Sequence, residues 1–192
     1  MSHHLDIDGI LEKLILLQHF SAGSRSYCAG RLIGSELDQG DGEFDEYWGW
    51  VKGIVCSDTL ECSIKFRVLQ DSTAGEIDRE RFDALDEKSR VGLDVGAATH
   101  GDFELTLREL SNKIIHATRV VPEWQCSTVD GTEFKFWSGT LALSGERGGK
   151  PWDLRLNVSA WAHAMQRFLS DSESEEAFRY VGQDWFPKDN AP

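Results

Sequence analysis

Three polar side chains, placed at intervals of four residues, are the first groups in this sequence that could do chemistry. They are Arg108, Asn112 and His116, and they fall in the segment from Leu105 to Thr118, whose apolar residues recur at helical spacing. Because residues four apart lie on one face of a helix, we expect these side chains to form one polar stripe. An arginine beside a histidine can bind a phosphate group and move a proton. The simpler interpretation is a solvated helix face, or a network of contacts at the helix end.

The second half of this segment reads Ser111-Asn112-Lys113-Ile114-Ile115-His116. This run resembles the motif of HEPN-type helical proteins, a group that includes abortive-infection and toxin ribonucleases. In that motif an arginine, a polar residue that is often asparagine, and a few further residues precede the histidine. The resemblance implies a helical core and metal-independent cleavage of RNA by the arginine and the histidine together. Ser111 stands where the motif has its arginine, and Arg108 lies about one turn earlier. This departure implies a degenerate site, or a relative that never had the activity.

Asp58 is the fourth candidate, because it interrupts the apolar stripe of a long helix predicted from about Phe44 to Gln70. A buried carboxylate costs several kcal/mol unless it is paired, so we expect Asp58 to have a cationic or hydrogen-bonding partner. Arg108 and His116 are the natural partners if the two helices pack together. Asp58 would then either orient His116 as a titratable base or tie the helices together structurally.

The cysteines form no metal motif, and other cofactor motifs are absent. The sequence has no C-x-x-C pair and no histidine at zinc-finger spacing from a cysteine. It also lacks a dinucleotide-binding glycine motif, a phosphate-binding loop, H-E-x-x-H and the lipase-type nucleophile motif. We therefore expect no cofactor and no metal. We expect free, buried thiols at the four cysteines, Cys28, Cys56, Cys62 and Cys126.

The charge and composition of the chain limit the kinds of partner that we expect it to bind. The chain has 192 residues, with 20 Lys and Arg against 33 Asp and Glu, which gives a net charge of −13. An acidic surface disfavours duplex DNA, which proteins bind through a basic excess. The chain shows no apolar run long enough for a membrane span and no signal peptide at its N-terminus. We therefore expect a cytoplasmic protein that binds neither duplex DNA nor a membrane.

The elements that would position the candidate residues change type at Pro122. Before it, over about residues 5–118, apolar residues recur at helical spacing. The helix that begins at about residue 5 either continues or restarts near Ser24. The predicted helices cover about residues 5–37, 44–70, 76–90 and 105–118.

After Pro122 the spacing of apolar residues becomes two, which predicts strands. Turn signals at Asp130-Gly131 and over residues 146–150 divide residues 123–158 into a three-stranded antiparallel meander. Trp137 and Trp152 fall in adjoining strands, either as core anchors or, if they face outward, as an aromatic contact patch. Ser159 is expected to cap a C-terminal helix over about 159–170, and a tail follows over 171–192, with a short helix around 177–181.

These elements predict a single α+β domain over residues 1–192, with the helices packed on one face of the meander. We expect a non-enzymatic binding or interaction protein, with a HEPN-like helical core as the resemblance implies. One alternative is a metal-independent ribonuclease of a host-defence or toxin system that uses Arg108 and His116. Another is an acidic inhibitor or immunity-type partner of a basic protein. The expected partner is a protein, with RNA and a second copy of the chain as alternatives.

Overall fold

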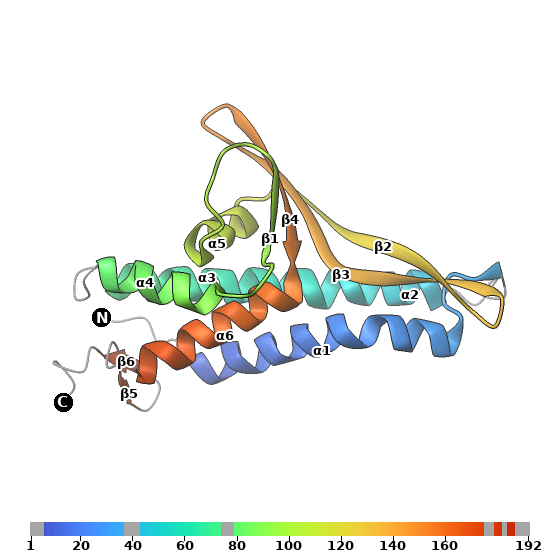
Figure 1. The fold of residues 1–192 in the computed structure, drawn as a ribbon, viewed down its shortest axis with the longest axis horizontal. Helices are drawn as coiled ribbons and strands as arrows, with labels where there is room; N and C mark the ends of the chain where they lie inside the picture. Colours follow the sequence, from blue (N-terminus) through green and yellow to red (C-terminus); the bar gives the residue numbers. More distant parts are fainter. Residues whose placement is uncertain (1–5, 37–42, 74–78, 175–178, 182–183, 187–192) are drawn as a thin grey trace.

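The structure, a computed structural model, describes residues 6–36, 43–73, 79–174, 179–181 and 184–186. Two long helical runs lie side by side along the molecule (Figure 1). The second of them confirms the helix predicted over about 44–70 and contains a π-helical turn, η2. The runs are α1 (Ile7–Arg31), and α2 (Glu43–Trp50), η2 (Val51–Val55) and α3 (Cys56–Thr73) in succession.

Local chemistry fixes both ends of α1. The carboxylate of Asp6 accepts a hydrogen bond from the backbone N–H of Gly9 at 2.9 Å and so caps the first turn. The last turn closes at Leu32, which adopts the left-handed conformation with φ of 53°. The helix therefore continues through Ser24 without a restart and ends at Arg31, before the predicted residue 37.

The strands form a four-stranded antiparallel sheet in the order β1-β4-β3-β2. The α+β class is confirmed, with helices first, then strands and a C-terminal helix, but the prediction of three strands is wrong. β2 also begins at Arg119 rather than at residue 123, so Pro122 lies within it. The strands are β1 (Gly96–His100), β2 (Arg119–Val129), β3 (Thr132–Arg147) and β4 (Lys150–Asn157).

The additional strand, β1, lies in the connection between the helices predicted over 76–90 and 105–118, where no strand was predicted. It pairs with β4, with Gly96 opposite Leu156. Its sequence, Gly-Ala-Ala-Thr-His, has no large apolar side chains in alternation, and most of its side chains are exposed. An edge strand of this kind takes its conformation from its neighbour, so the apolar pattern could not reveal it.

Three further helices follow α3 along the chain: α4 (Arg79–Arg90), α5 (Leu107–Ile115) and α6 (Val158–Ser174). Residues 76–78 of the predicted surface helix lie outside the described residues. The cap of α6 is Asn157, whose side-chain oxygen accepts a hydrogen bond from the N–H of Ala160 at 3.1 Å. The prediction of Ser159 as the cap is wrong, and α6 extends to Ser174 into the predicted tail.

The sheet buries one face against α1, α5 and α6. Trp137 and Trp152 lie on this covered face and are only 1% and 3% exposed, so the alternative of an outward aromatic patch is wrong. All four cysteines are free, as predicted. Cys28 and Cys62 are buried, whereas Cys126 on β2 is exposed, which corrects the expectation for that thiol.

Beyond α6, two short strands pair antiparallel: β5 (Arg179–Val181) and β6 (Asp184–Phe186). Residues 179–181 are therefore strand, and the predicted helix around 177–181 is wrong there; residues 177 and 178 lie outside the described part of the chain. No helix in the described residues is long and apolar enough to cross a lipid bilayer.

Candidate functional site

The helix that carries the polar stripe, α5, is fixed at its N-terminus by two side chains. The hydroxyl of Thr106 accepts a hydrogen bond from the backbone N–H of Glu109 at 3.1 Å. The carboxylate of Asp86, from α4, accepts one from the N–H of Leu107 at 2.9 Å. Both satisfy amides that the first turn of a helix leaves without partners. Leu107, Leu110 and Ile114 are buried, and they orient the opposite face of α5 towards solvent.

The structure brings Arg108, Asn112 and His116 to one pocket of about 740 Å³, which lies between α5, α3 and the end of β3. Their contacts differ. The guanidinium of Arg108 is hydrogen-bonded to Asp71 at 3.1 Å, and the amide of Asn112 donates to Glu109 at 3.1 Å. The exposed side chain of His116 has no hydrogen-bond partner among the described residues. No carboxylate in the described part of the chain therefore orients this imidazole as a base.

Asp58 lies elsewhere. Its carboxylate accepts a hydrogen bond from Nζ of Lys13 on α1 at 2.6 Å, and the side chain of Asp58 is 13% exposed. The expected cationic partner exists, but the prediction of Arg108 or His116 is wrong. The reason is that Asp58 lies on the side of α3 that faces α1, whereas α5 meets another side. The hydrogen bond to Asp58 holds the pKa of Lys13 above its ordinary value.

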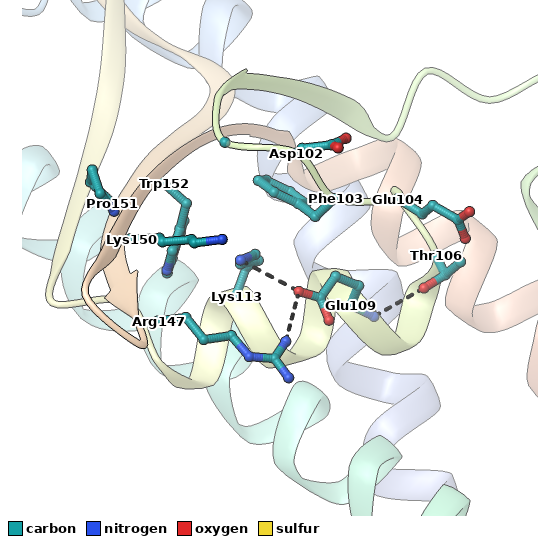
Figure 2. A pocket seen from close by; sticks show the side chains of 11 residues that line it. Asp102, Phe103, Glu104, Thr106, Glu109, Lys113, Arg147, Lys150, Pro151 and Trp152 are labelled. Carbon is teal, nitrogen blue, oxygen red and sulfur yellow. Dashed lines mark hydrogen bonds and ion pairs between the residues drawn. The ribbon is translucent and has the colours of Figure 1, made fainter.

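The central residue of the region was missed by the sequence analysis. Lys113, on α5, has a side chain that is only 7% exposed. Its Nζ lies 4.2 Å from the ring centre of Phe103 and 4.6 Å from that of Trp152, which is cation–π geometry (Figure 2). Among the described residues, Glu109 is its only ion-pair partner, at 3.4 Å. The spacing of four residues between Glu109 and Lys113 could have predicted the ion pair. Nothing in the sequence indicated that the rings of Phe103 and Trp152 lie beside Lys113.

Trp152 reaches Lys113 because of a glycine on the neighbouring strand. Gly145 on β3 is paired with Trp152 on β4, and the indole lies directly against the Gly145 backbone. A Cβ at this position would lie within 2.8 Å of Cε2 of the indole. The lack of a side chain at Gly145 thus positions the ring that covers Lys113.

A second pocket, of about 570 Å³, adjoins the first. Its walls are the loop from Gly101 to Glu104, α5, and the end of the β3–β4 hairpin (Figure 2). We call the two pockets together the α5 groove. They share five lining residues, which are Thr106, Glu109, Lys113, Arg147 and Trp152.

The larger pocket is cationic, although the chain is strongly acidic. Its lining includes two more basic than acidic side chains, even with His116 taken as neutral. The basic side chains are Arg67, Arg108, Lys113 and Arg147, and the acidic ones are Glu109 and Glu146. This local excess in the larger pocket contrasts with the net charge of −13 of the chain. Over the whole α5 groove the excess is smaller, because the second pocket adds Lys150 but also Asp102 and Glu104.

Comparison of the chain with protein-family models, curated proteins and solved structures finds no match. The resemblance to HEPN-type proteins therefore stays a prediction. Ser111, at the position of the motif's arginine, is fully buried on the core side of α5, whereas His116 is exposed. Within the described part of the chain, no group of three or more His, Cys, Asp or Glu residues could hold a metal ion.

Proposed function

We propose that the protein is a non-enzymatic binding protein whose partner presents negative groups to the α5 groove. The observation that carries this proposal is the excess of cationic side chains in the larger pocket of a chain with a net charge of −13. Such a patch attracts negative groups selectively, because the acidic remainder of the surface repels them. The two pockets, at about 740 and 570 Å³, have the size of ordinary ligand sites.

The contacts of the polar stripe favour binding over catalysis. General base catalysis needs a titratable group held in position, and no described side chain holds His116. Stabilising a transition state needs donors preorganised towards the reacting group. The guanidinium of Arg108 instead contacts Asp71 and, at 3.4 Å, Gln70.

The test is an NMR titration of the labelled protein with citrate, a small polyanion that is neither protein nor nucleic acid. The proposal predicts amide shifts along α5 and at residues 147–150. These shifts should weaken in Arg147→Ala. They should persist in Arg119→Ala, a matched arginine on the open face of the sheet outside the groove. Citrate-induced shifts that lie outside α5, or that are the same in Arg147→Ala as in the wild type, would overturn the proposal.

A metal-independent ribonuclease is the second candidate, because Arg108, Asn112 and His116 do line one pocket. The resemblance implies an arginine at the position of Ser111, and the loss of one preorganised charge contact costs on the order of 10²–10³ in rate. We therefore expect no cleavage of a mixed RNA pool in the absence of metal. Cleavage that disappears in His116→Ala would replace the binding function with the ribonuclease.

A further inference from the structure

We propose that the occupant of the α5 groove is an acidic peptide segment of a partner protein, with its carboxylates seated on Arg147 and Lys150. This inference rests on the proposed function and names the chemistry of the partner. It depends on three features of the groove: cations that are only partly paired with carboxylates, the small number of exposed aromatic rings, and acidic side chains between the cations.

The two cations at the end of the β3–β4 hairpin have one ion pair between them among the described residues. Arg147 and Lys150 are cross-strand partners that flank the turn Gly148-Gly149. The side chain of Arg147 is 76% exposed, and its carboxylate partner, Glu109, lies 3.5 Å away. Lys150 is exposed and forms no ion pair with any described residue. Like charges directly opposite each other on adjacent strands are unfavourable, and a carboxylate bound between them would relieve the repulsion.

Glu109 compensates the charge of Arg147 only in part, because other donors share its carboxylate. It is also paired with Nζ of Lys113 at 3.4 Å and accepts the amide hydrogen bond of Asn112 at 3.1 Å. Lys113 is buried between two rings, and Glu109 is its only ion-pair partner among the described residues. One carboxylate therefore serves both Lys113 and Arg147 (Figure 2), and Lys150 has no ion-pair partner in the described part of the chain.

The aromatic side chains of the groove favour a peptide over a single-stranded nucleic acid. Proteins bind single strands by stacking bases on exposed rings. Trp152 is only 3% exposed, and Lys113 lies over the faces of both Trp152 and Phe103. The one other aromatic ring that lines the groove among the described residues is the exposed imidazole of His116. Bases would therefore find a single small ring rather than a series of rings on which to stack.

The acidic side chains of the groove point to the same class of partner. Asp102 and Glu104 line the loop wall, and Glu146 lies beside Arg147. A phosphate backbone carries a charge at every unit and would meet these carboxylates. A peptide can place its acidic residues on the cations and uncharged residues between them. Since α5 has nine residues and is about 13 Å long, about four extended residues would cover it.

The experiment measures fluorescence anisotropy with two labelled probes at physiological ionic strength. One is a short peptide in which Glu and Ala alternate, and the other is an oligouridine of matched length. We expect the peptide to bind and the oligouridine not to bind. The double variant Arg147→Ala, Lys150→Ala should weaken peptide binding at least about tenfold. The matched control, Arg25→Ala with Arg119→Ala, likewise removes two exposed cations, and its peptide affinity should stay within about twofold of the wild type.

The outcomes separate this inference from the proposed function. Binding of oligouridine but not of peptide, lost in the hairpin double variant, would overturn the acidic peptide while the groove remains a binding site. Peptide binding that is equal in the wild type and the hairpin variant would also overturn the inference. Failure of both probes, together with citrate shifts outside α5, would overturn the inference and the proposed function together.

Discussion

Asp86 and Leu107 are joined by a hydrogen bond that fixes the start of α5: Oδ2 of Asp86 accepts the backbone N–H of Leu107 at 2.9 Å. The other carboxylate oxygen of Asp86 accepts a hydrogen bond from Nε of Arg90. The side chain of Asp86 is only 6% exposed. A carboxylate at a helix N-terminus also interacts favourably with the helix dipole. The α5 groove therefore depends on a residue of α4 that does not line it.

Replacing Asp86 should destabilise the whole protein. Asp86→Ala removes the partner of the Leu107 amide and leaves Arg90 without its buried carboxylate. We expect a loss of about 3 kcal/mol in the free energy of unfolding, measured by urea denaturation. The neighbouring exposed acid provides the control, because Glu87→Ala should change this free energy by less than about 0.5 kcal/mol. Equal effects of the two variants would show that the Asp86 contact has no special role.

The ion pair between Lys13 and Asp58 is partly buried, so its removal should have a moderate effect. We expect Asp58→Ala to lower the free energy of unfolding by about 1 to 2 kcal/mol, less than for a fully buried pair. A double-mutant cycle with Lys13→Met isolates the pair, and a coupling energy near zero would contradict its role. Because Asp58 raises the pKa of Lys13, the pair stabilises fully below the ordinary lysine value of 10.5. This contribution should be lost as the pH rises through the higher pKa of the folded state.

These contacts show which parts of the structure the sequence could predict. The change of apolar spacing at Pro122 separates helices from strands, because each type of element exposes one face at its own period. The spacing of four also predicts that Arg108, Asn112 and His116 lie on one side, and they do line one pocket, although His116 is the C-cap of α5 rather than part of it. It could not show that Asp58 meets Lys13 rather than α5, because helix packing is decided by contacts between distant segments.

The aromatic surroundings of Lys113 could not be predicted for a similar reason. Phe103 lies in a loop and Trp152 on β4, and only the docking of α5 against the β3–β4 hairpin brings them to the same ammonium group. β1 was not predicted, because its small side chains do not alternate between apolar and polar residues. In both cases the sequence specifies the residues, while the tertiary structure decides which of them meet.

Gly145→Ala should displace the indole of Trp152, which lines the α5 groove. An added Cβ would collide with the indole of Trp152, and overpacking of this kind costs about 1 to 3 kcal/mol. Displacement of the indole should also shift the NMR signals of Lys113. Gly53→Ala is the control, because a Cβ there meets nothing within 4 Å. If Gly145→Ala were as stable as the wild type, with unchanged Lys113 signals, the proposed role of Gly145 would be wrong.

Alkylation should distinguish the thiols of the native protein. Burial raises the pKa of Cys62 to about 12, so this thiol is protonated at neutral pH, and the thiolate is the reactive form. Burial also raises the pKa of Cys28. Cys126 is exposed, and we expect it to react first with iodoacetamide, as read by peptide mass spectrometry. Modification of Cys62 before Cys126 in the folded protein would contradict the burial of α3.

The most direct test of the α5 groove reverses the charge of its two hairpin cations. In Arg147→Glu with Lys150→Glu, the hairpin end becomes acidic without a change in the core, since both side chains are exposed. We expect the variant to lose binding of the Glu-Ala peptide and to gain binding of a peptide in which Lys and Ala alternate, whereas the wild type should show the opposite preference. A variant that still binds the acidic peptide as the wild type does would overturn the proposed role of the hairpin cations. A wild type that prefers the basic peptide would contradict it too, and would favour an acidic inhibitor of a basic protein.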